Sequence, residues 1–262
     1  MVAELETSRF RGTRPLWGVM WMHLAVESIL EGRTAARMFV DDAAKPRAAM
    51  TWTGQRLYLA GDVGSAEFSE ILNTQYVPTH RWFVTYCSPE AIDCAVMSLP
   101  GKVVRRVRIY YEGDPSKHTC VVEPPEGYVI EPITKSLLNR GLTHTDWVME
   151  EMTSERSSVE EFLGKSFGFA ALHGGEFACW CMSEYNLWDR CEVGIETVKE
   201  HRRRGLANLV AGAMFDHAAD MGVRRIGWHC WADNVGSLAT AKRLGLRRVA
   251  DFPALFVDAD GV

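Results

Sequence analysis

The sequence predicts an α/β protein with a mixed sheet, built from two domains, and three observations support this prediction. Apolar residues make up 47% and charged residues 24% of the 262 positions, which is typical of a globular protein. Segments with the two-residue period of a strand alternate with segments that have the period of a helix. Two prolines and a glycine at 123–127 interrupt the strand-like pattern, so we expect an N-terminal domain of residues 1–124 and a C-terminal domain of residues 125–262.

The N-terminal domain is predicted to begin with a helix over residues 16–30. His23 and Glu27 interrupt its apolar run, so we expect an amphipathic helix rather than a signal peptide or a membrane span. Ser65 is a candidate N-cap for a second helix over residues 66–73. Strand-like segments in this half are residues 37–40, 47–53, 56–60, 81–86 and 103–110.

The C-terminal domain has a clearer order of predicted elements. Its first two strands form a hairpin through a turn that contains Gly174 and Gly175. The helix that follows the third strand continues through apolar residues at three- and four-residue steps. In chain order, the strands are 167–172, 176–182, 190–198, 225–230 and a last segment ending at 257, with helices after Gly205 and from Asn234 to Gly245. Because hairpin then helix recurs in both halves, one interpretation is that the N-terminal domain is a degenerate copy of this fold.

The most informative segment is residues 196–207, where the third strand ends in a turn that opens directly into a helix. Arg202, Gly205 and Ala207 stand there at the spacing Arg-x-x-Gly-x-Ala. The first turn of a helix carries unpaired N–H groups and a partial positive charge, and Gly205 allows a ligand to approach the backbone closely. Three consecutive arginines, residues 202–204, add charge that a diphosphate can use. The segment therefore predicts a phosphate-binding turn, without the Gly-x-Gly turn of dinucleotide-binding oxidoreductases.

The net charge and the cysteine content indicate which partners and which cellular compartment to expect. The formal net charge of −5 gives no reason to expect a nucleic acid partner, and no membrane partner is expected either. Seven cysteines, an odd number, fit a reducing compartment, so a cytoplasmic location is expected. Cys179, Cys181, Cys191 and Cys230 lack the spacing of a zinc knuckle and are interpreted as small buried side chains, so we expect no metal. A homodimer is left open.

Residues 167–257 resemble the core of the Gcn5-related N-acetyltransferase (GNAT) superfamily. The turn at 202–207 is similar to its pyrophosphate loop, Gln/Arg-x-x-Gly-x-Gly/Ala, and the spacing from Asn234 through Ser237 to Gly245 is similar to its second core helix. Shorter stretches, among them Glu-Val-Gly-Ile and Trp-His-Cys, resemble one subgroup. That subgroup includes acetyltransferases associated with self-resistance to the aminopolyol antibiotic zwittermicin A.

This resemblance implies an acetyl-CoA-dependent N-acetyltransferase. The acetyl group would pass to a primary amine of a small molecule by direct attack in a ternary complex, and the N-terminal domain would help to shape the acceptor site. The implied cofactor-binding residues are Ile195, Glu196, Thr197, Arg202, Arg203, Arg204, Gly205, Leu206, Ala207, Asn234 and Ser237. The alternative is a non-catalytic acyl-CoA-binding sensor.

Acyl transfer to an amine requires a base, because most alkylamines are protonated at neutral pH. The third strand places Glu192 and Glu196 on one face, so we predict Glu192 as the base and Glu196 as the second choice. The non-catalytic interpretation is a pair of solvated carboxylates. Gly194, between them, predicts a bulge or a close backbone approach. By resemblance, this strand separates from its neighbour, and a backbone N–H of residues 195–197 stabilises the thioester oxygen.

One position departs from the superfamily pattern. Many members carry a tyrosine that protonates the leaving thiolate, and this chain has Ala241 there. A thiol with a pKa near ~8.5 leaves without such help, so Ala241 does not exclude catalysis. Four residues are left open as the group that protonates the thiolate in place of the tyrosine: Tyr185, His229, Cys230 and Ser237. Asn234 also has two interpretations, as a helix N-cap or as a hydrogen-bond partner of pantetheine.

Overall fold

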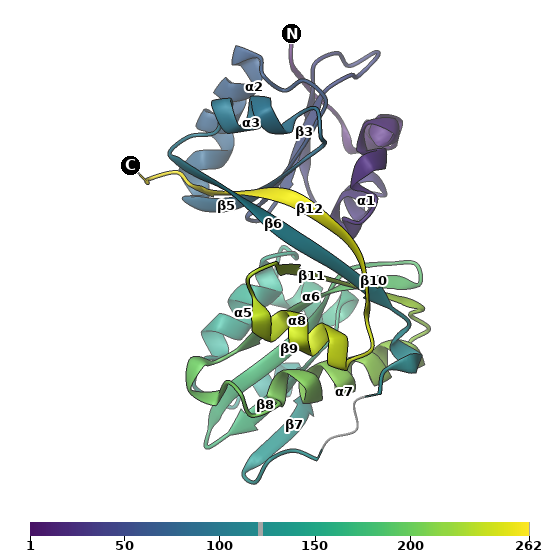
Figure 1. Cartoon of the computed structure of the whole chain (residues 1–262), viewed down its shortest axis with the longest axis vertical. Coiled ribbons are helices and arrows are strands. Elements are labelled where there is room, and N and C mark those ends of the chain that lie inside the picture. The colour runs from purple at the N-terminus through teal and green to yellow at the C-terminus, as the bar shows by residue number, and fades with distance from the viewer. Residues whose placement is uncertain (120–122, 262) are drawn as a thin grey trace. The chain divides into compact units, whose positions relative to one another are not determined.

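The computed structural model describes residues 1–119 and 123–261, and the chain divides into two compact units (Figure 1). The first unit comprises Met1–Arg108 together with Asp251–Val262, and the second comprises Ile109–Ala250. Within the described ranges, no helix is both long enough and apolar enough to cross a membrane.

The division of the chain differs from the boundary at residues 124/125 that the sequence predicts. Two strands explain the difference, because β6 (Lys102–Gly113) and β12 (Arg247–Asp258) each begin in one unit and end in the other. The proline-containing segment 123–127 leads instead into β7 (Tyr128–Pro132), within the second unit. Prolines here mark a connection between strands and not the end of a domain.

The first unit is a mixed sheet with short helices. Its sheet order is β1 (Ala3–Glu4), β2 (Arg37–Val40), β3 (Ala49–Thr53), β4 (Arg56–Ala60), β5 (Trp82–Cys87) and then β12. Its helical segments are η1 (Thr7–Met20), α1 (Leu24–Leu30), α2 (Ala66–Ile71), η2 (Leu72–Tyr76), η3 (Val77–Thr79) and α3 (Ile92–Ser98). Each strand that the sequence predicts in this half is present, with small differences at the ends.

The helix predicted over residues 16–30 is wrong in its first half. η1 is a 3-10 helix that ends at Met20, and the α-helix α1 begins only at Leu24. Pro15 has no N–H for an α-helical hydrogen bond, and Gly18 has a low helix propensity. Both residues therefore disfavour an α-helix over this stretch, although its apolar spacing indicates one.

The helices α2 and α3 contribute to the core of the first unit. Phe68 of α2 and Ile92 of α3 are buried in one cluster with Leu57 of β4 and Phe83 of β5. The predicted N-cap is confirmed, because the Ser65 side chain accepts a hydrogen bond from the Phe68 N–H at 3.4 Å.

Gly61, directly after β4, is a position that requires glycine. Its φ of 72° is left-handed, and a Cβ there would lie 2.0 Å from the carbonyl oxygen of Arg47. We expect Gly61→Ala to lower the free energy of unfolding by about 3 kcal/mol, because the left-handed conformation is strained and the backbone must also move. Gly32→Ala is the control, since its φ is 66° but the nearest atom to a Cβ is Thr7 Cγ2 at 3.5 Å. Equal losses in denaturant unfolding would contradict the crowding argument.

The second unit has the order of elements that the sequence predicts for the C-terminal half. Its elements are η4 (Pro115–Lys117), β7, α4 (Lys135–Leu138), α5 (Thr145–Thr153), α6 (Val159–Lys165), β8 (Gly168–His173), β9 (Glu176–Leu187), β10 (Arg190–Thr197), η5 (Lys199–His201), α7 (Leu206–Asp220), β11 (Arg225–Trp231) and α8 (Val235–Arg243). Its sheet order is β6-β11-β10-β9-β8-β7. The predicted last strand, β12, instead pairs its later residues with β5 of the first unit.

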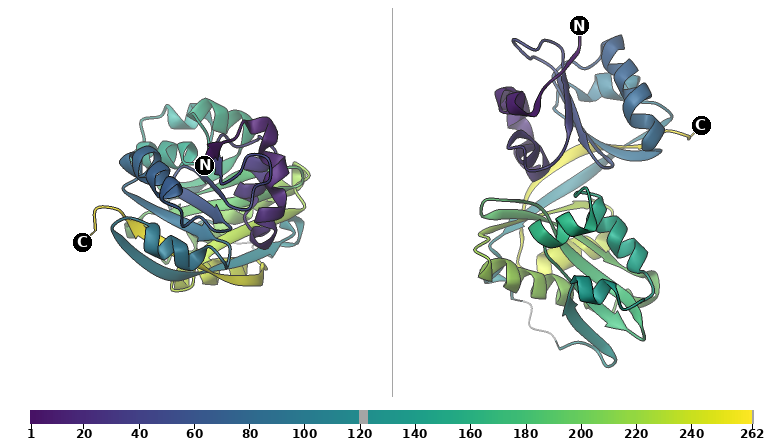
Figure 2. Two further views of the ribbon diagram at one scale, coloured as in Figure 1. Left: turned by 90° about the horizontal axis from the view of Figure 1, so that it is seen from above. Right: turned by 180° about the vertical axis from the view of Figure 1, so that it is seen from behind.

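Helices cover both faces of the sheet in the second unit (Figure 2). Along β9, Cys179 and Cys181 face a core formed with α7 and α8, and Trp180 belongs to a separate core formed with α5 and α6. Cys191 and Cys230 lie in the same core as Cys179, as small buried side chains. Burial raises the pKa of the Cys179 thiol to about 12, so this thiol is neutral at physiological pH.

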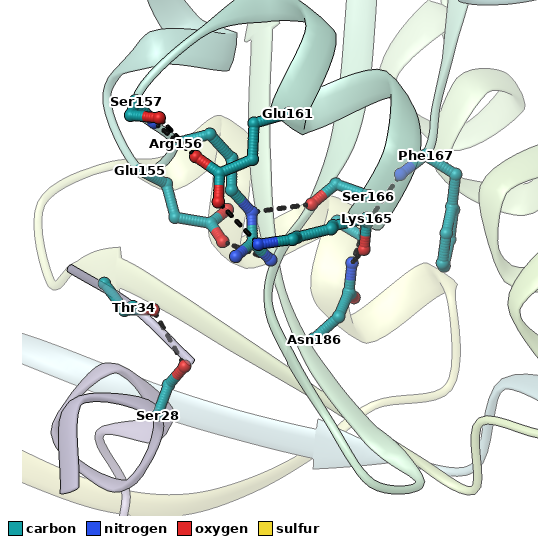
Figure 3. Close-up of polar contacts among 11 residues, drawn as sticks. Ser28, Thr34, Glu155, Arg156, Ser157, Glu161, Lys165, Ser166, Phe167 and Asn186 are labelled. Carbon is teal, nitrogen blue, oxygen red and sulfur yellow. Dashed lines mark hydrogen bonds and ion pairs between the residues drawn. The ribbon is translucent and has the colours of Figure 1, made fainter. Parts of the chain in front are cut away.

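Hydrogen bonds at its first turn stabilise α6, a helix that the sequence analysis does not predict (Figure 3). Ser158 accepts from the N–H of Glu161 at 3.1 Å, and the Glu161 carboxylate accepts from the N–H of Ser157 at 2.9 Å. Lys165 donates to the same carboxylate at 2.7 Å. The hydrogen bonds from Lys165 and Ser157 lower the pKa of Glu161 to about 2. Capping of this kind satisfies N–H groups that have no partner within the helix.

Both units repeat one order of elements. β2, β3, β4, α2, β5, α3 and β6 follow one another in the first half as β8, β9, β10, α7, β11, α8 and β12 do in the second. The pairing repeats too, because β4–β5 and β10–β11 are parallel and the two preceding pairs in each set are antiparallel. This topology supports the interpretation of a degenerate copy, although the chain after β4 reads Gly-Asp-Val-Gly-Ser and lacks the arginine-rich turn.

Candidate active site

The strands β10 and β11 begin side by side and then separate. Their parallel pairing consists of Arg190 with Arg225, Cys191 with Ile226 and Glu192 with Gly227. β10 stays paired with β9 as far as Thr197. The separation that the resemblance implies is therefore present, and it leaves one edge of β10 open from residue 193 onward.

Backbone groups of alternate residues face this open edge. The N–H of Val198 donates to a carbonyl of the neighbouring β9 segment at 3.0 Å, so the antiparallel alternation directs the N–H groups of Ile195 and Thr197 away from β9. The groups of Thr197 already have partners: its N–H donates to Glu196 Oε1 at 3.0 Å, and its carbonyl accepts from Arg202 Nε at 3.0 Å. The N–H of Ile195 is therefore the better placed for a ligand.

The turn between β10 and α7 contains two left-handed residues. Arg203 has a φ of 64° and Gly205 a φ of 81°. A Cβ at Gly205 would meet no atom within 4 Å, so this glycine is favoured by its backbone conformation and the space beside it is open. α7 begins at Leu206, directly after the turn, and its first N–H groups are the expected phosphate donors.

A cavity of about 630 Å³ lies beside this turn. Its volume falls within the range of about 300–1,000 Å³ that is usual for small-molecule sites. The structure brings all the predicted cofactor-binding residues except Arg204 to its lining: Ile195, Glu196, Thr197, Arg202, Arg203, Gly205, Leu206, Ala207, Asn234 and Ser237. Three segments that are separate in the sequence therefore meet around one cavity.

Asn208 and Trp228 are two of the other lining residues, for which the sequence predicts no role. Asn208 of α7 is buried, and its Oδ1 has no hydrogen-bond partner in the described part of the chain. A buried oxygen in this state is rare, so it fits a donor on a ligand. The signal that could have found it is a polar residue within the otherwise apolar start of a helix. Trp228 Nε1 donates to Ser237 Oγ at 3.0 Å and so positions that lining hydroxyl.

The structure confirms one interpretation of Asn234. Its Oδ1 accepts a hydrogen bond from the N–H of Ser237 at 3.1 Å, which makes Asn234 the N-cap of α8. Because it also lines the cavity, contact with pantetheine stays a prediction. The two roles are compatible, since an amide side chain also carries N–H donors.

Three polar side chains meet where β10 and β11 separate. The side chains of Glu192 and His229 are each 9% exposed, and His229 Nε2 lies 3.2 Å from Glu192 Oε1. The buried ring of Tyr110, from β6, is 4.8 Å from the ring of His229. Gly227 makes room for this group, because a Cβ there would lie 3.0 Å from Tyr110 Cε2 and 3.1 Å from Glu192 Cγ. Burial, followed by the charge of Glu192, raises the pKa of Tyr110.

Gly194 lies beside two carboxylates and not at a bulge. The register shift between β9 and β10 falls between Arg190 and Glu192, so the bulge predicted at Gly194 is wrong in position. A close approach occurs there, but it is made by side chains and not by backbone, because a Cβ at Gly194 would lie 2.7 Å from Glu151 Oε1 and 2.8 Å from Glu184 Oε1. Carboxylates of α5 and β9 therefore reach the same place on β10.

The two predicted catalytic carboxylates have different surroundings. The side chain of Glu196 is 51% exposed, and its Oε1 accepts from Arg202 at 3.2 Å as well as from the Thr197 N–H. Glu192 is buried against His229. Glu192 is therefore better placed to act on a substrate, because Oε1 of Glu196 already accepts two hydrogen bonds.

The four residues left open as the general acid have different surroundings in the structure. His229 contacts Glu192, whereas Cys230 lies in the core against α7, as does Ala241. Ser237 is bound by Trp228, and Tyr185 is fully buried with a left-handed φ of 50°. Of these residues, His229 is the one whose contact with the predicted base the structure shows.

The GNAT acetyltransferase family model matches residues 18–255. The chain therefore belongs to the GNAT acetyltransferase family, whose enzymes use acetyl-CoA as co-substrate. It is 26% identical over 257 residues to the uncharacterized N-acetyltransferase YdfB of Bacillus subtilis (strain 168), an alignment that covers 96% of this chain and 97% of that protein.

Solved structures share the fold over nearly the whole chain. A GCN5-related N-acetyltransferase-like protein from Streptococcus suis 89/1591 has a TM-score of 0.76 and 21% identity, covering 95% of this chain and 98% of that one. A tandem GNAT protein from the clavulanic acid biosynthesis pathway has a TM-score of 0.60 and 14% identity, covering 100% of this chain and 99% of that one. At these identities the likeness shows the fold alone, and it agrees with the repeated order of elements in the two units.

Proposed function

We propose that this protein transfers an acetyl group from acetyl-CoA to a primary amine of a small molecule, by direct attack in a ternary complex. The observation that supports this proposal most strongly is the separation of β10 from β11. The separation begins at Glu192, and the residues of β10 beyond it, from Ile195 to Thr197, line the cavity beside the turn. A thioester that lies along the open edge would thus have a buried carboxylate near its reactive end.

In this proposal the turn and the start of α7 bind the diphosphate of acetyl-CoA. The left-handed residues Arg203 and Gly205 shape the backbone there, and helix N-termini favour anions. The pantetheine chain would lie along the open edge of β10, with its thioester oxygen toward the Ile195 N–H. Asn208 Oδ1 would accept a hydrogen bond from the same substrate, because it is a buried acceptor in the cavity lining.

Glu192 would accept a proton from the bound ammonium, and His229 would orient the Glu192 carboxylate. The free amine nitrogen then forms a bond to the thioester carbonyl carbon, whose oxygen becomes negative and accepts a hydrogen bond from the Ile195 N–H. Collapse of this species breaks the carbon–sulfur bond, the electron pair leaves with sulfur as the thiolate of CoA, and the second proton of the nitrogen passes to solvent.

The likeness to the zwittermicin self-resistance subgroup agrees with a small-molecule amine as acceptor. Ala241 is the observation that favours the sensor alternative, because it stands where many family members carry the acidic tyrosine. The two functions differ in one measurable product, since a sensor binds acetyl-CoA without releasing free thiol.

We expect micromolar binding of acetyl-CoA by calorimetry and thiol release that depends on an added amine. The screen would use purified protein, acetyl-CoA and a panel of primary amines, with desulfo-CoA as a non-reactive ligand and a reaction without amine as the control. Tight binding with no thiol release for any amine would favour the sensor. An absence of binding would contradict both functions.

A further inference from the structure

A second cluster of polar side chains lies outside the proposed catalytic group. His173 ends β8, Glu176 begins β9, and His201 ends η5, directly before Arg202 of the turn. Ligand atoms of these three residues all lie within 4.8 Å of one another. His201 is buried, and the other two are partly exposed, so the cluster is both held by the fold and open to solvent.

Hydrogen bonds orient the cluster. His201 Nε2 lies 2.9 Å from Glu176 Oε1, and His201 Nδ1 lies 2.7 Å from the hydroxyl of the buried Tyr128. A carboxylate can only accept, so Nε2 carries the proton and Nδ1 accepts from Tyr128. On the other side of the carboxylate, His144 Nε2 lies 3.5 Å from Glu176 Oε2. The ring of Tyr128 also lies 4.5 Å from the ring of His173.

We propose that His173, Glu176 and His201 bind a divalent transition metal ion, with Zn²⁺ as the best match. Two imidazoles and one carboxylate are a common set of three protein ligands for zinc, with a water at the fourth position. Tetrahedral Zn²⁺ with bonds of about 2.1 Å needs ligand atoms about 3.3–3.5 Å apart. The observed separations bracket this value, so small shifts of the partly exposed His173 and Glu176 side chains suffice.

Tyr128 supports the metal-bound state through the proton of His201. When Nε2 of His201 forms a bond to the metal, its proton leaves to solvent and Nδ1 takes up a proton from solvent, so the ring stays neutral and the Nδ1–H then donates to the Tyr128 oxygen. A second hydrogen bond of this kind is typical of metal-binding histidines, because it fixes the tautomer and the ring orientation. Tyr128 is therefore a positioning residue.

The metal site would act on the turn as well. His201 also lines the cavity, and its N–H donates to the Val198 carbonyl at 2.9 Å within η5. A metal bond to His201 would restrict η5 and the turn that follows it. Tighter acetyl-CoA binding in the presence of the metal is then expected, and this consequence alone depends on the proposed function.

A metal ion at this cluster would revise the expectation from the sequence that no metal binds. That expectation considers the cysteines, which the structure places in a core against α7. The histidines of the new cluster come from a hairpin and from a turn, and their spacing in the sequence matches no zinc motif. Folding brings them together.

The test is a titration of untagged, chelator-treated protein with ZnCl₂ by calorimetry, and with CoCl₂ by visible absorption. We expect one ion per chain, about 100-fold weaker binding for His173→Ala, and about 10-fold weaker binding for Tyr128→Phe. His118→Gln is the matched control, because His118 also contacts a carboxylate, that of Asp216 at 2.8 Å, away from this cluster. It should bind the ion like the wild type.

Two outcomes would overturn the proposal. One is a folded wild-type protein that binds neither ion below millimolar concentration, which would leave the cluster as a hydrogen-bonded brace. The other is equal binding by wild type and His173→Ala. Near-ultraviolet circular dichroism checks the fold of each variant, and Glu176→Gln replaces His173→Ala if that variant does not fold.

Discussion

Replacing Glu192 with glutamine should lower kcat/KM for acetyl transfer by about 100-fold or more, which is the usual contribution of a general base. The substitution removes the charge but keeps the size of the side chain and an oxygen that can accept from His229 Nε2. The affinity for CoA should stay within about threefold of wild type, because Glu192 does not line the cavity beside the turn. Thiol release under saturating and limiting acetyl-CoA, together with calorimetry, measures the two effects separately.

Glu196→Gln is the matched control for this prediction. Glu196 lies on the same face of β10, but it is half exposed and paired with Arg202. We expect less than about a fivefold change in kcat, because exposed ion pairs contribute little. If Glu196→Gln lost the activity and Glu192→Gln kept it, the assignment of the base would be reversed. If neither lost it, the chemistry would depend on another group.

The backbone of the turn that is proposed to bind phosphate could be predicted from the sequence because its determinants are local. A left-handed glycine, consecutive arginines and the start of an apolar helix lie within a few residues of one another, so the pattern specifies the structure directly. The strand period likewise placed Glu192 and Glu196 on one face, since successive side chains of a strand point to opposite faces. The N-cap at Asn234 is local in the same way.

The groups around Glu192 could not be predicted, because they depend on pairing between distant segments. Tyr110 comes from β6, Glu151 from α5 and Glu184 from β9, and nothing in the local sequence of each indicates the others. Two glycines mark the place in retrospect. A Cβ at Gly194 or at Gly227 would occupy space that these side chains fill. A glycine within a predicted strand is therefore a useful sign of a site.

The predicted domain boundary differs from the division of the chain into two units for a related reason. β6 and β12 look like ordinary strands of the half in which they begin, and their later residues pair in the other half. Which sheet a strand joins is decided by tertiary packing, and strand propensity carries little information about it. Prolines and glycines in the 123–127 segment are common to loops within a domain and between domains, so composition alone could not distinguish the two cases.

Substituting Gly205 with tryptophan should abolish measurable CoA binding, a loss of about 100-fold or more if two charge-assisted phosphate contacts are removed. The φ of 81° is strained for any residue with a Cβ, and the new side chain would start in the open space beside the cavity. Both effects act on the turn that is proposed to bind the diphosphate. Calorimetry with acetyl-CoA and with desulfo-CoA measures the loss, and acetyl transfer should fall with it.

Gly222→Trp isolates the steric effect on the ligand from the strain on the backbone. Gly222 follows the other end of α7, its φ is 83°, and a Cβ there would also meet no atom within 4 Å. Both variants should therefore lose similar stability in thermal unfolding, because they carry the same left-handed residue. The Gly222 variant should keep wild-type affinity for CoA, since it lies outside the cavity lining. Equal loss of binding in the two variants would mean that strain, and not occupation of the turn, weakens the site.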